Sequence, residues 1–294
     1  MTTNPQNLSP TPFFSWGVER ICQRSLPLAG VDHKHDNGGA GVSVYLVDTG
    51  IDYGHHDLSC CAHPGYDAFG GNGADELGNG TFLAGVIAAI APKAALYSVK
   101  ILDGQANGSI EGIVGAIEWI TMNAQKPAVV NVAIGIPPNE MLDDAIRASI
   151  ASGITYVIEG GGVSDDVGNS SPARIREGII VGASDCSDRM ADFSNFGEGL
   201  DIFAPGVEIT SAMLGGGSTT MSGVQIAAAH VSGVVALHLC EGPHMTPAEV
   251  KQKILQEALV EALANVPEGT PNRLLQFGIY TGTGKQWADS VGSS

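Results

Sequence analysis

The chain has 294 residues, of which 44% are hydrophobic and 15% are charged, so it is long enough to bury a large core. Its formal net charge of −17 argues against contacts with phosphates, which need clustered Lys and Arg, and we expect no nucleic-acid partner. The 40 glycines indicate many tight turns and closely packed elements. A single α/β domain fits this length and composition.

The cysteines and the start of the chain bear on where the protein works. No Cys-x2-Cys pair or repeated spacing relates Cys22, Cys60, Cys61, Cys186 and Cys240, so free thiols in a reducing compartment are expected. No basic segment followed by an apolar run opens the chain, and no span approaches ~20 uninterrupted apolar residues. These features predict a cytoplasmic protein without a signal peptide or a membrane helix.

The ends of the chain differ in composition from its middle. Residues 1–14 are polar and rich in proline, which predicts an N-terminal arm. A domain over 15–280 and a flexible tail over 281–294 complete the predicted organisation.

Between the ends, apolar runs alternate with amphipathic stretches, which by itself supports an α/β domain. Strands are predicted over 41–50, 95–103, 128–135 and 154–162, and helices over 76–90, 110–124, 138–152, 222–237 and from a capping box at Thr246. The first strand ends at Asp48, and functional groups gather at the carboxyl ends of parallel strands. Asp48 is therefore a candidate site residue.

The helix over 222–237 carries the strongest signal. Ile226, His230, Val234 and Leu237 share one helical face, and Gln225 stands in the first turn. A helix start of this kind directs free N–H groups and a positive dipole end outward, which suits a nucleophile or an anion. An amide such as that of Gln225 can act neither as a nucleophile nor as a general base at neutral pH.

The segment 223–233, which reads Gly-Val-Gln-Ile-Ala-Ala-Ala-His-Val-Ser-Gly, resembles the serine block of the subtilases, and proteinase K-like members most closely. Asp48-Thr49-Gly50, the Gly-rich turn of 76–90 and the segment 200–206 resemble further blocks of that family. The resemblance runs in matching order through about 15–280. It implies an α/β fold, a subtilisin-like three-layer sandwich with a mostly parallel central sheet flanked by helices.

The same resemblance assigns roles to site positions. It places Asn79 at the catalytic histidine, Gln225 at the nucleophilic serine and Gly162 at the oxyanion-hole asparagine. Asp48 matches the aspartate that orients the histidine, and Glu159 lies where a small apolar residue lines the specificity pocket. A carboxylate there is costly unless it is paired, hydrogen-bonded or protonated. Asp48, Asn79, Glu159 and Gln225 are the candidate catalytic residues.

Binding groups are expected where the family binds extended substrate. The candidate binding residues are Gly135, Ile136, Gly160, Gly161, Gly162, Asn107 and Gly108. Pro137 and Pro138 remove N–H donors where a peptide would add as a strand. Asp201 matches a calcium ligand of relatives, but Arg176 and Gly178 replace neighbouring residues, and we expect no metal and no cofactor.

Subtilase catalysis requires an activated hydroxyl, an imidazole and oxyanion donors, so this set of residues predicts a non-proteolytic protein. His55, His56 and His230 match family histidines that supply no nucleophile. One hypothesis is a former protease cleft that binds and transforms a small-molecule ligand by cyclisation or isomerisation, with Glu159 as acid or base. The alternative is an inactive pseudoprotease that binds a peptide or protein partner. A protease inactivated in the laboratory fits less well, because one change would suffice for that.

Overall fold

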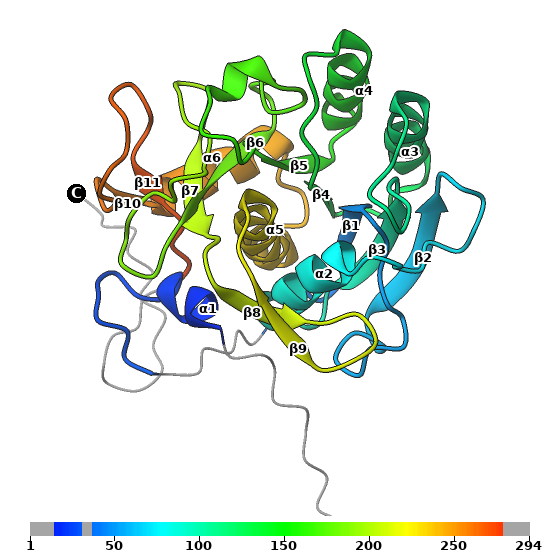
Figure 1. The fold of residues 1–294 in the computed structure, drawn as a ribbon, viewed down its shortest axis with the longest axis horizontal. Helices are drawn as coiled ribbons and strands as arrows, with labels where there is room; N and C mark the ends of the chain where they lie inside the picture. Colours follow the sequence, from blue (N-terminus) through cyan, green and yellow to red (C-terminus); the bar gives the residue numbers. More distant parts are fainter. Residues whose placement is uncertain (1–14, 31–36, 279–294) are drawn as a thin grey trace, which may run out of the picture.

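The computed structural model describes residues 15–30 and 37–278 (Figure 1). The predicted arm over 1–14 and the predicted tail over 281–294 lie outside the described residues. The described part is an α/β sandwich in which one large sheet lies between two layers of helices. This agrees with the predicted architecture.

The central sheet has nine strands among the described residues, in the order β10-β11-β7-β6-β5-β4-β1-β3-β2. All neighbours pair in parallel except β10 and β11, which are antiparallel. The strands are β1 (Ser43–Asp48), β2 (Ala62–Asp67), β3 (Ala95–Lys100), β4 (Ala128–Val132), β5 (Thr155–Glu159), β6 (Ile179–Ser184), β7 (Ile202–Pro205), β10 (Leu259–Val260) and β11 (Arg273–Leu274). A separate hairpin pairs β8 (Ile209–Ala212) with β9 (Ser218–Met221).

Alternate residues of the strands serve two cores. In β1, Val44 and Leu46 pack on the side of α2 and α5, whereas Tyr45 and Val47 pack on the side of α3 and α4. Because both faces are covered, the strand reads as one continuous apolar run. The helices are α1 (Trp16–Arg20), α2 (Asn79–Ile90), α3 (Ile110–Asn123), α4 (Glu140–Ala151), α5 (Val224–Glu241) and α6 (Pro247–Glu257), with a short 3₁₀ turn η1 (Val167–Asn169).

Helix α5 is the core helix of the fold and lies near the middle of the view in Figure 1. It is long and apolar enough to cross a membrane by length and composition alone, but 83% of it is buried inside the protein. Ile226, His230, Val234 and Leu237 are all buried, but so are the other residues from Ala227 to Leu239, so protein surrounds α5 on every side and no single buried face is distinguished. The apolar composition of this helix therefore reflects its packing against α2 and the sheet.

Two predicted helix starts are present in detail. The helix predicted over 138–152 is α4, and the side chain of Asn139 caps it by accepting a hydrogen bond from Leu142 N at 3.0 Å. Thr246 and Glu249 form a complete capping box at the start of α6. Both signals are local, so they were readable from the sequence.

The start of α2 is pressed against the turn after β1. Gly80 N donates to Thr49 Oγ1 at 3.0 Å, and a Cβ added at Gly80 would lie 2.0 Å from the Gly50 carbonyl oxygen. Only a residue without a side chain permits this approach of two backbones. The contact fixes α2 at the carboxyl end of β1.

Replacement of Gly80 by alanine should therefore destabilise the fold by about 1–3 kcal/mol, because the obstructing atom is backbone and cannot rotate away. Urea denaturation followed by circular dichroism measures this loss. Gly54→Ala is the matched control, since Gly54 is exposed and its nearest contact is the Asp52 side chain. The control should stay within about 0.5 kcal/mol of the parent chain. Equal stability of the two variants would contradict the close-approach argument.

Candidate functional site

The carboxyl ends of adjacent strands bring two candidate carboxylates to one edge of the sheet. Asp48 ends β1 and Glu159 ends β5, and β4 lies between these strands. The first turns of two helices reach the same edge. Gly80 of α2 touches Gly50, and Gly162, which follows β5, approaches Val224 of α5. The helix starts that carry Asn79 and Gln225 thus lie at the same edge as the two carboxylates, and we call this region the carboxyl-edge site.

Asp48 is almost fully buried, with 3% of its surface exposed. Its Oδ1 accepts a hydrogen bond from Thr49 N at 2.6 Å. Burial raises the pKa of Asp48 to about 7, and this effect outweighs the Thr49 hydrogen bonds and the nearby Lys100 charge. A carboxyl with such a pKa changes its charge near neutral pH.

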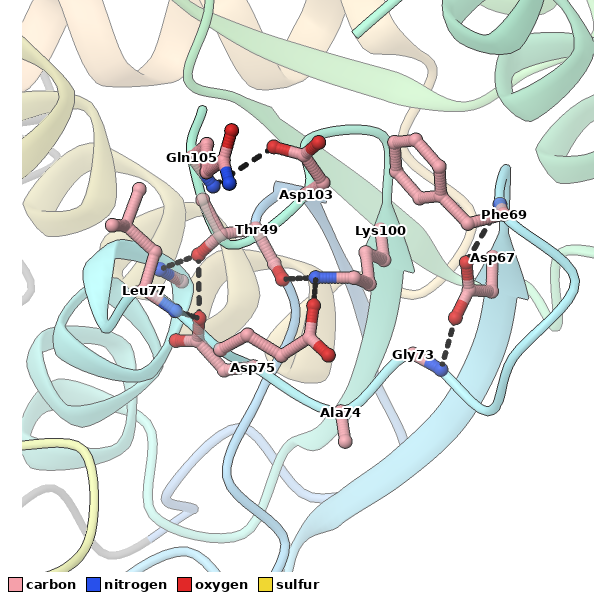
Figure 2. Close-up of polar contacts among 12 residues, drawn as sticks. Thr49, Asp67, Phe69, Gly73, Ala74, Asp75, Leu77, Lys100, Asp103 and Gln105 are labelled. Atoms are coloured by element: carbon pink, nitrogen blue, oxygen red, sulfur yellow. Dashed lines mark hydrogen bonds and ion pairs between the residues drawn. The ribbon is translucent and has the colours of Figure 1, made fainter. Parts of the chain in front are cut away.

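A second buried aspartate, Asp75, holds the surroundings of Asp48 together (Figure 2). Its Oδ1 accepts from Thr49 Oγ1 at 2.8 Å and from the backbone N–H groups of Leu77 and Gly78. Its Oδ2 accepts from Thr81 N and Thr81 Oγ1 at 2.9 and 2.6 Å. Burial alone would raise the pKa of Asp75, but these hydrogen bonds outweigh it and lower the pKa.

Lys100, at the end of β3, supplies the cation of this network. Its Nζ donates to the Thr49 carbonyl oxygen at 2.7 Å and lies 3.4 Å from Glu76 Oε2, and Figure 2 shows it reaching toward Thr49. Lys100 is 4% exposed, whereas the Glu76 side chain is 64% exposed. Sequence reasoning missed Lys100 and Asp75 as parts of the site. A lysine inside an apolar strand was the available signal, since such a charge is rarely buried without a partner.

Glu159 is half-buried, and burial raises its pKa to about 8, with the charge of Asp48 as the second cause. No hydrogen bond contributes to this shift. A methyl group at Gly135 would lie 3.8 Å from Glu159 Oε1, so the predicted binding residue Gly135 borders the carboxyl. Glu159 and Asp48 therefore form an interacting pair of carboxyls, neither of which is neutralised by a salt bridge in the part of the chain that is described.

The two amides stand at helix starts. Asn79 is the first residue of α2 and Gln225 the second of α5, and both side chains are half-buried. The Gln225 amide folds back on its own helix start, where a methyl group at Gly223 would meet Gln225 Oε1 at 2.4 Å. Among the described residues neither side chain has a hydrogen-bond partner, so both keep free donors.

The glycines after β5 are organised by a residue that sequence reasoning missed. Asn195 Nδ2 donates to the Gly160 carbonyl at 2.9 Å, and Asn195 N donates to the Gly161 carbonyl at 2.9 Å. Gly161 has a positive φ of 97°, and a side chain there would strike Asn195. The carbonyls of Gly160 and Gly161 are thus occupied, whereas a methyl group at Gly162 would lie 3.8 Å from Val224 of α5.

Two other predicted binding segments are also folded on themselves. Ile136 exchanges both backbone hydrogen bonds with Ser171 at 2.9 Å. Asn107 is tied to Asp103 through its N–H, its carbonyl and its side-chain amide, and Gly108 packs on the Ile101 carbonyl. These groups shape the neighbourhood of the site, and their roles in binding stay predictions.

The candidate replacement histidines lie in the wrong places for catalysis. His230 is buried in α5, its Nδ1 lies 2.9 Å from the Ile226 carbonyl, and burial lowers its pKa to about 4. His55 is 2% exposed, and its Nε2 lies 2.9 Å from the Gly217 carbonyl. His56 is exposed beside Asp57. None of the three is held by Asp48.

Comparison with known proteins decides the family. A sequence model described as the subtilase family matches residues 39–279. The chain belongs to the subtilase family. The recognition of this family from its blocks is therefore confirmed, and so is the predicted subtilisin-like fold.

Individual relatives agree with this assignment. An extracellular serine proteinase of Thermus sp. (strain Rt41A) is 39% identical over 269 residues, which cover 89% of this chain and 65% of that protein. Alkaline serine exoprotease A of Vibrio alginolyticus is 35% identical over 267 residues, covering 88% of this chain and 49% of the relative. The solved structure of a cold-adapted subtilisin-like serine proteinase has a TM-score of 0.86 and 34% identity, and the match covers 89% of this subtilase and 97% of that chain.

These relatives overturn the predicted function. We predicted a non-proteolytic enzyme that acts on a small molecule by cyclisation or isomerisation. The alternative was an inactive pseudoprotease with a degenerate triad. Both are contradicted, because the relatives are named as proteinases or proteases of the serine or subtilisin-like type. The residues at positions 79, 162 and 225 did not by themselves determine the activity of the whole protein.

The predicted cytoplasmic location is also wrong. The Thermus relative is named an extracellular proteinase, which points away from the cytoplasm. All five cysteines are free thiols in the structure, as expected. Free thiols did not justify the inference of a reducing compartment, because unpaired cysteines such as Cys22 also serve as small buried apolar residues.

The pKa of Glu159 predicts how the stability of this subtilase depends on pH. The pKa of Glu159 in the folded chain, about 8, lies above its ordinary value of 4.5. The free energy of unfolding is therefore highest below about pH 4.5, where Glu159 is protonated in both states, and falls as pH rises through about 8. Glu159→Gln should remove this loss. The difference in free energy of unfolding between the variant and the parent chain should therefore shift by at least about 1 kcal/mol in favour of the variant from pH 5 to pH 9. Urea denaturation at both pH values measures it. Glu118→Gln, on the exposed face of α3, should show no such gain; parallel pH profiles of parent and Glu159→Gln would refute the assignment.

Proposed function

We propose that this subtilase hydrolyses peptide bonds at the carboxyl-edge site, with Glu159 moving the proton. The observation that carries the proposal is the pair of interacting carboxyls, Asp48 and Glu159, whose pKa values are raised to about 7 and about 8 beside the first turn of α5. Perturbed carboxyls of this kind are typical of acid and base catalysts. The relatives' names supply the substrate class, a polypeptide, in place of the small molecule first expected.

We also infer that Asn79 and Gln225 occupy the places of the family's catalytic histidine and serine. A water molecule then replaces the serine hydroxyl as the nucleophile. Ionised Glu159 accepts a proton from this water while its oxygen attacks the scissile carbonyl carbon. As the C–N bond breaks, Glu159 returns the proton to the leaving nitrogen, and the products are a carboxylic acid and an amine.

The amides have a role as donors in this scheme. The free N–H groups of Asn79 and Gln225, with the backbone N–H groups at the start of α5, stabilise negative charge that develops on the carbonyl oxygen. Donors held by helix starts lose little freedom during the reaction. We expect Gln225 to contribute less than Glu159, because its amide lies against Gly223 and must turn away from it to donate to a substrate.

Asp48 tunes the catalyst. Its negative charge is one cause of the raised pKa of Glu159, so the two carboxyls titrate as a coupled pair. Lys100 and the Thr49 N–H oppose complete protonation of Asp48. Glu159, which is the more exposed of the two, is the carboxyl that meets water.

The first test is peptide hydrolysis between pH 5 and pH 10, measured as new amino termini released from unfolded casein. The rate should rise with pH through about 8, as Glu159 ionises, and Glu159→Gln should lose at least about 100-fold. Asp48→Asn should move the rise to lower pH by about one unit, because it removes the neighbouring negative charge. Glu118→Gln should behave as the parent chain. Absence of hydrolysis by the parent chain, or an unchanged rate in Glu159→Gln, would refute the proposal.

A second test addresses the two amide positions. The double variant Asn79→His with Gln225→Ser should hydrolyse peptides at least about tenfold faster near pH 8 and become sensitive to a sulfonyl fluoride. The physical reason is that an imidazole at 79 would lie between Asp48 and a hydroxyl at 225. Asn79→Ala with Gln225→Ala is the control and should gain neither property. Failure of the histidine–serine variant to react with the inhibitor would show that these positions are not those of the family's pair.

A further inference from the structure

Two neighbouring cysteines, Cys60 and Cys61, lie in the turn that leads into β2, the edge strand of the large sheet (Figure 1). Neither forms a disulfide, and the proposed reaction does not involve them. Cys60 is exposed, whereas Cys61 is 6% exposed. A small reagent therefore reaches the pair from the side of Cys60.

The backbone of this pair is held in place on two sides. The Leu58 carbonyl accepts from Cys61 N at 3.0 Å and from Ala62 N at 2.8 Å, and the Cys61 thiol donates to the same oxygen at 3.5 Å. The Cys61 carbonyl accepts from Leu96 N, which belongs to β3, at 2.8 Å. Because the two Cα atoms are one peptide unit apart, about 3.8 Å, this anchoring fixes the backbone of Cys60 as well.

The two thiols also interact with each other. A hydrogen bond joins the side chains of Cys60 and Cys61, so the two sulfur atoms lie side by side. Burial raises the pKa of Cys61 to about 12, and the charge of Cys60 and this hydrogen bond act in the same direction. Cys61 is therefore a neutral thiol near neutral pH. The pair offers two sulfur donors that keep a proton.

These properties disfavour two common fates of paired cysteines. A disulfide between adjacent residues is strained, because its Cα atoms are about 3.8 Å apart and unstrained disulfides need about 4.4–6.8 Å. A metal cation must displace the thiol protons, and a raised pKa makes this costly. Zinc also needs four ligands, and within residues 15–30 and 37–278 no group of three or more His, Cys, Asp or Glu is placed to hold a metal ion.

We propose that Cys60 and Cys61 form a binding site for trivalent arsenic that carries at least two hydroxyl groups. Each thiol sulfur forms a bond to arsenic while one bond from arsenic to a hydroxyl oxygen breaks. Each thiol proton leaves with that hydroxyl group, so two molecules of water are released. Arsenic stays trivalent, and the step consumes no oxidant or reductant. Because arsenic bridges the sulfur atoms, they stay farther apart than the roughly 2 Å of a disulfide bond.

The pair should bind arsenic more tightly than the other cysteines, which have no cysteine next to them in the chain. Cys186 is exposed but is a single thiol, Cys22 is buried, and Cys240 is half-buried. After the first sulfur–arsenic bond has formed, the second closes within one molecule, and such a step gains about 100-fold or more over two separate bonds.

The experiment titrates the reduced full chain with phenylarsine oxide, whose hydrate carries two hydroxyl groups on trivalent arsenic, and counts the free thiols that remain. The parent chain should bind one arsenical with the loss of two thiols. Excess mercaptoethanol, a monothiol, should leave the arsenical bound, whereas 2,3-dimercaptopropanol, a dithiol, should remove it. Zinc should bind at least about 100-fold more weakly than the arsenical.

Variants of single cysteines locate the site. Cys60→Ser changes an exposed side chain, so it should fold as the parent chain does and lose at least about 100-fold in affinity. Cys61→Ala keeps a small apolar side chain in the core and should lose as much. Cys186→Ser is the matched control for an exposed thiol and should bind as the parent chain does. No binding by the parent chain, undiminished binding by Cys60→Ser, or release by the monothiol as readily as by the dithiol would overturn the proposal.

Discussion

The hydrogen bonds of one buried carboxylate, Asp75, hold the carboxyl-edge site in place. They connect the end of β1 through Thr49, the loop at Leu77 and Gly78, and the first turn of α2 through Thr81. Each accepted hydrogen bond stabilises the ionised form, which offsets the cost of burying the charge. Asp48 and Asn79 depend on this arrangement, because both follow from where the end of β1 and the start of α2 meet.

The acids of the protein show how environment sets chemistry. Asp75 is satisfied by N–H and O–H donors and has a lowered pKa, so it is structural. Asp201 is satisfied by the ammonium group of Lys251. Asp48 accepts one short backbone hydrogen bond and Glu159 has none that affects its pKa, and both pKa values are raised into the range where protons move near neutral pH. In a chain of net charge −17, it is the unsatisfied acids that are candidates for catalysis.

The family predicts serine-protease chemistry, whereas the residues at the carboxyl-edge site lack the serine and the histidine of that chemistry. A subtilase with relatives named serine proteinases has amides at two helix starts from which serine and histidine are expected. The site has helix starts that can stabilise negative charge and a titrating acid beside them, whereas the positions of the serine, the histidine and the oxyanion-hole asparagine carry other residues. The proposed activation of water by Glu159 would use these groups without an activated hydroxyl.

The sequence by itself determined the fold to a large extent. Apolar runs such as 43–48 and the helical face of Ile226 and His230 reflect burial on both faces of a sheet and in a core helix, and burial restricts residue type locally. The order of blocks then identified the family. Asp48, Asn79, Glu159 and Gln225 could be brought to one edge because strand ends and helix starts meet there in this topology.

Only the tertiary structure decided which polar groups are satisfied and by whom. The partners of Lys100, Asn195 and Lys251 lie 51, 35 and 73 residues away in the chain, and no periodic pattern records such pairings. The cost of a carboxylate at Glu159 could be expected from the sequence, but the size of its pKa shift and that of Asp48 depend on burial and on charges that meet only in the fold. Residue type is read along the chain, whereas charge, hydrogen bonding and reactivity arise between segments that meet only after folding.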